Sequence, residues 1–165
     1  MLDCIIFDLD GTLVDTLGDI SDAMNKTLAY FGFETKSQDS YSQLIGGGSR
    51  NMVDTLVPAD IASPVYDHFL AQYEYHMTDR TCAYPDVAAT LRQLQQDGIK
   101  LAVVTNKYYH QAVEIIEALF GDIQFDAIQG YVPGAFKKPH PQTTFAVLDQ
   151  LYVNPSARLF VGDTM

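Results

Sequence analysis

Short apolar runs alternate with amphipathic stretches in the first few and the last eighty or so residues of the chain. Four runs predict buried strands, because they are short, rich in β-branched residues and bounded by turn residues. They are CIIF (4–7), KLAVVT (100–105), FDAIQG (125–130) and RLFVGD (158–163). The stretches between them predict helices at 86–98, 109–121 and 141–152. This alternation predicts an α/β fold with a doubly wound, Rossmann-like parallel sheet.

The alternation stops between the first and second of these strands. Residues 16–82 contain no convincing strand pattern and predict consecutive helices at roughly 17–31, 38–44, 49–57 and 64–79. We therefore expect two domains. Residues 1–15 and 83–165 would form the α/β core, and residues 16–82 would form an all-helical cap domain inserted into it.

Composition narrows the classes of partner and the compartment. The 165 residues carry 21 acidic and 10 basic side chains, a net charge of −11, which argues against nucleic acid and anionic membranes as partners. Cys4 and Cys82 are the two cysteines, and neither belongs to a zinc or disulfide pattern. Since we also find no signal peptide and no apolar run of membrane-spanning length, we expect a cytoplasmic protein.

Polar side chains gather where the predicted strands end. Because the carboxyl ends of parallel strands meet at one edge of the sheet, ligands bind there. The residues that this places at the edge are Asp8, Asp10, Thr105, Asn106, Lys138 and Asp163.

The first strand delivers two of these carboxylates, Asp8 and Asp10, and alternate residues of a strand share a face. Gly11 permits a sharp turn directly behind them. Two like charges this close repel unless a cation lies between them, and Mg²⁺ suits a site of oxygen ligands that also keeps waters and phosphate oxygens. The alternative is that these acids cap the following helix, a role that suits Asp15 or Thr16.

The segment DLDGTLVD resembles the first signature of the haloacid dehalogenase-like hydrolase superfamily, in its phosphatase branch. Thr105 in VVTNK resembles the second signature and Lys138 in KKPHP the third, while GDT at 162–164 resembles the start of the fourth. The resemblance covers essentially the whole chain. The helical insertion is similar to the cap of phosphoglycolate phosphatase-like members.

The resemblance implies a role for each matched residue. Asp8 would be the nucleophile that forms an aspartyl-phosphate, and Asp10 the general acid and base. Mg²⁺ would be bound by Asp8, by the main-chain carbonyl of Asp10 and by Asp163. Thr105 and Lys138 would hold and neutralise the transferred phosphoryl group. Substrate contacts would come from Gly11, Thr12 and the amide of Asn106.

One further candidate lies in the helical insertion, in IGGGSRNMV (45–53). Main-chain N–H groups at a helix start bind anions, and Arg50 could bind a substrate carboxylate or a second phosphate. The alternative is a flexible turn between helices with a solvated arginine.

The matched residues favour phosphate ester hydrolysis over the other reactions of the superfamily. The resemblance implies a Mg²⁺-dependent phosphatase acting on a small phosphorylated metabolite, with 2-phosphoglycolate as the first candidate. An acid at Asp10 favours phosphoester chemistry over dehalogenation, and the absence of histidine from DTLGDISDA favours hydrolysis over a sugar phosphomutase. A second class is a non-catalytic phospho-acceptor module resembling a receiver domain, although receiver domains lack so large an insertion.

The sequence stops at FVGDTM, where the fourth signature of the superfamily usually continues with a second acid, a helix and a further strand. We therefore expect a C-terminally truncated sequence, and an inactive fragment is a third possibility. The oligomeric state is not predicted.

Overall fold

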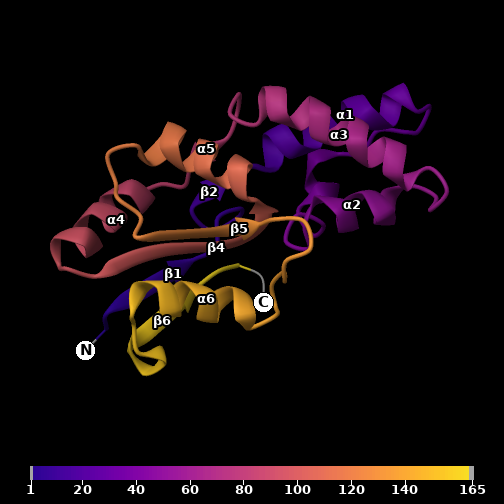
Figure 1. Cartoon of the computed structure of the whole chain (residues 1–165). Helices are drawn as coiled ribbons and strands as arrows, with labels where there is room; N and C mark the ends of the chain where they lie inside the picture. The colour runs from indigo at the N-terminus through magenta and orange to yellow at the C-terminus, as the bar shows by residue number, and fades with distance from the viewer. Residues whose placement is uncertain (1, 164–165) are drawn as a thin grey trace. The chain divides into compact units, whose positions relative to one another are not determined.

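A computed structural model describes residues 2–163. The chain divides into two compact units. One consists of Met1–Val14 and Ala83–Met165, and the other of Asp15–Cys82. Figure 1 follows the chain through both units. Each unit has a hydrophobic core of its own and is described separately.

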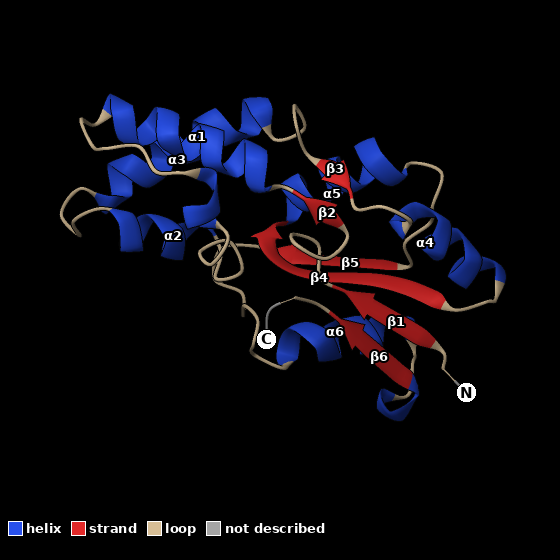
Figure 2. Cartoon of the chain, turned by 180° about the vertical axis from the view of Figure 1, so that it is seen from behind, coloured by secondary structure: helices blue, strands red, loops and turns tan. Residues whose placement is uncertain are grey.

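The first unit is built on a sheet of four parallel strands in the order β5-β4-β1-β6. Their bounds are β1 (Cys4–Phe7), β4 (Lys100–Tyr108), β5 (Ala127–Tyr131) and β6 (Arg158–Val161). Helices α4 (Val87–Gln96) and α5 (Tyr109–Phe120) pack on one face, and α6 (Gln142–Leu151) packs on the other, as Figures 1 and 2 show. A 3₁₀ turn, η2 (Pro155–Ala157), precedes β6. The predicted α/β class with a parallel sheet is confirmed.

Strand alternation explains how one sheet fills two cores. Ile5 and Phe7 of β1 belong to the core beneath α4 and α5, whereas Cys4 and Ile6 belong to the core beneath α6. Because both faces are covered, the central strands read as continuous apolar runs rather than as an alternating pattern. Edge strand β6 is less covered, and Leu159 and Phe160 are 48% and 38% exposed.

The second unit is helical. It contains α1 (Leu17–Tyr30), η1 (Gln38–Tyr41), α2 (Ser49–Leu56) and α3 (Ala62–His76). Buried Asp19 connects the two ends of this unit, because its carboxylate accepts hydrogen bonds from the main-chain N–H groups of Arg80 and Thr81 and from the Thr81 hydroxyl. A buried carboxylate with several such donors fixes the local backbone.

Besides shifts of a few residues at element ends, the structure differs from the predicted elements in three main ways. β2 (Val14–Asp15) and β3 (Cys82–Ala83) form a two-stranded sheet that is too short to leave a periodic pattern. The predicted helix at 38–44 is only the 3₁₀ turn η1, and β4 continues past Thr105 to Tyr108. Within residues 2–163, no helix combines the length and apolar character that crossing a membrane requires.

Tyr152 ends α6 in the left-handed conformation, with φ 54°, and its side chain is 96% exposed. This conformation costs a non-glycine residue about 1–2 kcal/mol, whereas glycine adopts it freely. We expect Tyr152→Gly to raise the free energy of unfolding by about 0.5–1 kcal/mol in urea denaturation, after the larger unfolded-state entropy of glycine is subtracted.

The matched control is Tyr75→Gly, at a similarly exposed tyrosine within α3. It is not expected to raise the free energy of unfolding, because Tyr75 lies in the last turn of α3, where glycine relieves no left-handed strain and only adds unfolded-state entropy. A Tyr152→Gly protein no more stable than the parent would contradict the strain argument.

Candidate active site

Asp8 is the first residue beyond β1, at the carboxyl end of the central sheet. Its main-chain N–H donates to the carbonyl of Val161, at 2.9 Å, so the ladder with β6 fixes its position. The side chain is only 6% exposed. One carboxylate oxygen accepts the N–H of Leu9 at 2.7 Å, and the other forms an ion pair with the Nζ of Lys138. The strand thus places a buried carboxylate against a lysine.

Burial and charge act on Asp8 in opposite directions. Burial raises the pKa of the Asp8 carboxyl above its ordinary value, and the neighbouring charge of Asp10 adds to that effect. The charge and hydrogen bond of Lys138 lower the same pKa. A nucleophilic carboxylate must be ionised, so Lys138 is the described side chain that most favours the reactive form.

The chain turns back on itself directly after Asp8. Gly11 has φ +77° and donates its N–H to the carbonyl of Val14 at 2.9 Å, which closes a tight loop. Asp163 lies against this loop: its N–H donates to the Thr12 hydroxyl at 3.1 Å. A Cβ atom at position 11 would lie 2.3 Å from a carboxylate oxygen of Asp163. Glycine is therefore required both for the conformation and for the close approach of Asp163.

The end of β4 holds the loop that carries Lys138. The side-chain oxygen of Asn106 accepts the N–H of Lys138 at 2.8 Å, and its amide group donates to the Lys138 carbonyl at 3.3 Å. Asn106 thus clamps both sides of the residue whose Nζ meets Asp8. Thr105, one residue earlier, is buried, and its hydroxyl accepts the N–H of Lys107 at 3.2 Å.

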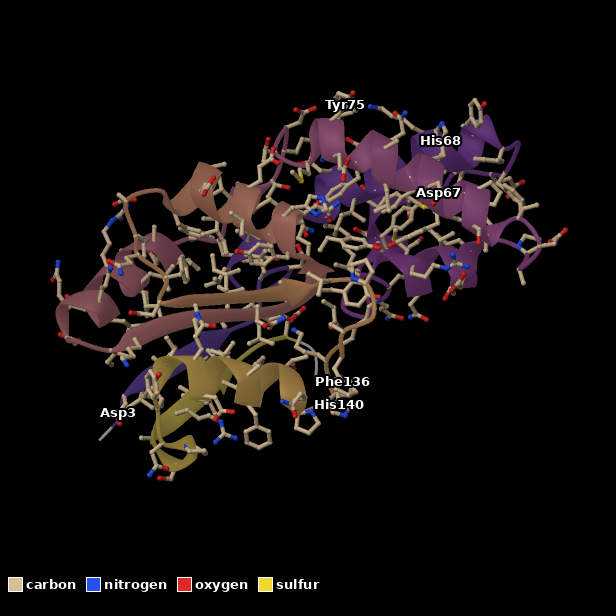
Figure 3. The ribbon with its side chains drawn as sticks, in the orientation of Figure 1. Asp3, Asp67, His68, Tyr75, Phe136 and His140 are labelled. Carbon is tan, nitrogen blue, oxygen red and sulfur yellow. The ribbon has the colours of Figure 1, made fainter. Side chains whose placement is uncertain are left out.

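The Lys138 loop is also closed on itself. The N–H of His140 donates to the carbonyl of Lys137 at 2.8 Å. The rings of Phe136 and His140 stack with their centroids 3.8 Å apart, and Figure 3 shows the two side chains together at the foot of this loop. The Lys138–Pro139 peptide bond is cis. These contacts make His140 part of the loop's structure.

The family of haloacid dehalogenase-like hydrolases has a sequence model that matches residues 5–165. The match includes the Asp8 strand, the helical unit, the Lys138 loop and Asp163. The chain belongs to this family. The sequence predicted a phosphoric monoester hydrolase. That prediction is confirmed, because the relatives are phosphatases of the same family.

Similar proteins cover almost the whole chain. A phosphoglycolate phosphatase of Aquifex aeolicus (strain VF5) is 36% identical over 97% of this chain and 75% of its own length. One from Agrobacterium fabrum (strain C58) is 34% identical over 97% of this chain and 72% of its own. The crystal structure of a predicted phosphoglycolate phosphatase from Haemophilus somnus 129pt superposes with a TM-score of 0.89 at 30% identity, covering 98% of this chain and 77% of that one.

In this haloacid dehalogenase-like hydrolase, the α/β unit brings together most of the residues predicted from the sequence. Direct contacts join Asp8 with Lys138, Lys138 with Asn106, and Asp163 with the Gly11–Thr12 turn. Their roles in the reaction stay predictions.

Arg50 lies in the helical unit, at the start of α2. Its Nε donates to both carboxylate oxygens of Asp54, at 2.9 and 3.1 Å, and one of its terminal nitrogens donates to the Ser63 hydroxyl. The guanidinium also lies over the ring of Tyr66, 5.4 Å from its centroid. A substrate anion at Arg50 would have to compete with Asp54. The Arg50 side chain is 39% exposed, so a solvated arginine and an anion-binding arginine both stay predictions.

Lys107 is a residue of this edge that the sequence did not predict. Its Nζ donates to both carboxylate oxygens of Asp10, at 3.0 and 3.2 Å, and its side chain is only 4% exposed. A signal was present in VVTNK, because Lys107 lies two residues after Thr105, the spacing at which residues of a regular strand share a face. The predicted strand ended at Thr105, two residues before Lys107.

Asn106→Ala removes both hydrogen bonds that clamp the Lys138 backbone. Two such bonds contribute about 1–2 kcal/mol together, so we expect kcat/KM for phosphate release to fall about tenfold while the protein stays folded. The measurement is steady-state hydrolysis with circular dichroism on the same sample.

Asn154→Ala serves as the control, because the Asn154 side chain likewise takes part in two hydrogen bonds, both accepted from Ser156, in the turn before β6. It should leave kcat/KM unchanged. Equal losses in the two variants would show that the clamp has no specific effect on Lys138.

Proposed function

We propose that this phosphatase hydrolyses the phosphate monoester of a small metabolite through a phosphoenzyme intermediate on Asp8. The observation that carries the proposal is the environment of Asp8: a buried carboxylate at the carboxyl end of the central strand, paired with Lys138 and followed two residues later by Asp10 with a lysine of its own. A nucleophile, a charge-neutralising cation and a second acid are the groups that phosphoryl transfer requires.

The proposed reaction has two steps. An Asp8 oxygen attacks phosphorus, the bond between phosphorus and the ester oxygen breaks, and Asp10 gives its proton to the departing alcohol. Asp10 then takes a proton from water, which attacks the phosphorus of the aspartyl-phosphate and releases inorganic phosphate and free Asp8. Lys138 neutralises negative charge on the phosphoryl group in both steps, and Thr105 and the N–H of Asn106 hold its oxygens.

We propose that Mg²⁺ binds to the carboxylates of Asp8 and Asp163 and to the main-chain carbonyl of Asp10. All three donors are oxygens, as this cation prefers, and the Gly11–Thr12 turn holds Asp163 beside the loop that follows β1. Among residues 2–163, no group of three His, Cys, Asp or Glu side chains is placed to hold a metal. When bound, Mg²⁺ would supply Lewis-acid stabilisation of phosphoryl charge.

The first candidate substrate is 2-phosphoglycolate. The relatives from Aquifex aeolicus and Agrobacterium fabrum carry the name phosphoglycolate phosphatase. This substrate has a carboxylate beside its phosphate, and Arg50 is the side chain that we propose for it, in exchange for its pairing with Asp54. We further propose a cytoplasmic location, in keeping with two cysteines that are both free.

The test is phosphate release from 2-phosphoglycolate and a panel of sugar phosphates, with Mg²⁺ and with EDTA. We expect Mg²⁺-dependent release that Asp8→Asn lowers by at least about 10⁴-fold, because the amide cannot act as the nucleophile. Asp3→Asn, at the other end of β1, should leave the rate unchanged.

Each alternative has a distinct result. A phosphoaspartate that accumulates on Asp8 without turnover would indicate an acceptor module, and transfer of the phosphate within a sugar would indicate a phosphomutase. Undiminished hydrolysis by Asp8→Asn would exclude Asp8 as the nucleophile.

Gly11→Ala should weaken the metal site specifically. The added methyl group would displace the Asp163 carboxylate, since the two would be 2.3 Å apart. We expect the Mg²⁺ concentration for half-maximal activity to rise about tenfold or more, as is usual when a ligand's supporting contact is lost.

Gly98→Ala is the matched control in the same unit. Gly98 has φ +76°, close to that of Gly11, but a Cβ at position 98 would meet no neighbouring atom within 4 Å. Both variants suffer the same backbone strain, so an equal Mg²⁺ requirement in the two would argue against Asp163 as a ligand.

A further inference from the structure

Lys107 and Asp10 form a buried ion pair beside the nucleophile. They are 97 residues apart in the sequence, and their side chains are 4% and 13% exposed. The Nζ of Lys107 lies 3.0 and 3.2 Å from the two carboxylate oxygens of Asp10. A cation that bridges both oxygens restricts rotation of the carboxylate, whereas a contact to one oxygen leaves it free to swing.

Stability alone is a poor reason for such a pair. Taking two charges out of water costs several kcal/mol per ion, and apolar side chains of similar size are often as stable or more so. The pair is also local to the site, because Asp10 lies two residues after Asp8. Asp8 has a separate cation in Lys138, so Lys107 is not needed to neutralise it.

The backbone is shaped to present Lys107 at this point. The ladder between β4 and β5 is irregular between Val104 and Tyr108, and the N–H of Lys107 donates to the Thr105 hydroxyl within that segment. On β5, Gly130 leaves space for the main chain of Lys107 and Tyr109 because it has no side chain. A Cβ there would lie 3.1 Å from the Lys107 carbonyl oxygen and 2.5 Å from the Cα of Tyr109.

We propose that Lys107 is a positioning residue that fixes the carboxyl group of Asp10 toward the leaving-group oxygen of the substrate. The inference rests on the proposed function and assigns a separate role to each of the two lysines. Lys138 serves the nucleophile Asp8 and the phosphoryl group, while Lys107 serves the acid that protonates the departing alcohol. Its effect on the reaction is therefore carried entirely by Asp10.

This role has a signature that a merely structural lysine lacks. An alkyl ester such as 2-phosphoglycolate releases a basic alkoxide that needs a proton as it departs. 4-Nitrophenyl phosphate releases a stabilised phenolate that does not. General-acid catalysis typically contributes 10²–10⁴-fold, so misplacing the acid should affect only the alkyl ester strongly. kcat/KM is the appropriate quantity, because it includes leaving-group departure but not the later attack of water.

The experiment compares kcat/KM for both esters in the full chain and in Lys107→Met, a variant of similar shape without charge. We expect the value for 2-phosphoglycolate to fall at least about tenfold more than the value for 4-nitrophenyl phosphate. Asp10→Asn should show the same selective loss. Combining the two substitutions should lower kcat/KM little beyond Asp10→Asn alone, because Lys107 acts through Asp10.

Lys100→Met is the matched control. Lys100 begins the same strand, is partly buried and donates its Nζ to the carbonyl of Leu151 at 2.7 Å. Its loss should leave the ratio of the two kcat/KM values unchanged. If Lys107→Met does not fold, Lys107→Arg keeps the charge but moves it, and should steepen the dependence of kcat/KM on leaving-group basicity across substituted phenyl phosphates.

Three results would overturn the inference. They are equal losses on both esters in Lys107→Met, multiplicative losses in the double variant, and an unchanged dependence on leaving-group basicity in Lys107→Arg. In each of these the parent enzyme is active, so the proposed function stands. A parent enzyme that releases phosphate from neither ester would overturn the proposed function and the role of Lys107 with it.

Discussion

Repulsion between two neighbouring carboxylates is the constraint on which the active edge of this protein depends. Asp8 and Asp10 follow β1 with one residue between them, and both are largely buried. Each has a lysine of its own, and the two lysines come from different elements: Lys107 from β4 and Lys138 from the loop beyond β5. The site therefore forms only when three separate parts of the chain meet.

The central position of β1 makes that meeting possible. Parallel pairing with β4 on one side and β6 on the other brings the ends of all three strands to one edge. β4 contributes Asn106, which holds the Lys138 backbone, and the segment after β6 contributes Asp163. A one-residue shift of register would turn the side chains of β1 to the opposite faces of the sheet, which would disrupt the packing of both cores and separate the charges. The pairing of β1 with β4 and β6 thus determines both the packing of the cores and the positions of the site residues.

The sequence predicted the sheet and most of the site because local signals carry both. Apolar runs of four to six residues mark buried strands, and DLDGT places acids and a glycine where the first strand ends. What the sequence did not predict also has a physical reason, because it depends on contacts between residues far apart in the chain or on strands of two residues. Lys107 is a charged residue in a buried strand, and only a partner 97 residues away makes its burial tolerable. Pairs such as Asn106 with Lys138 are likewise long-range, and two-residue strands such as β2 have no period to detect.

Gly130 shows how the framework is adapted to the main chain around Lys107. It lies in β5 and has no functional group, yet the irregular end of β4 fits against it only because it lacks a side chain. A side chain at residue 130 would therefore displace the main chain of Lys107 and Tyr109. Among relatives that keep a lysine at the end of β4, residue 130 should vary little, and where that lysine is lost the restriction should relax. Variation at residue 130, which has no reactive group, would then indicate whether a relative needs the lysine at residue 107.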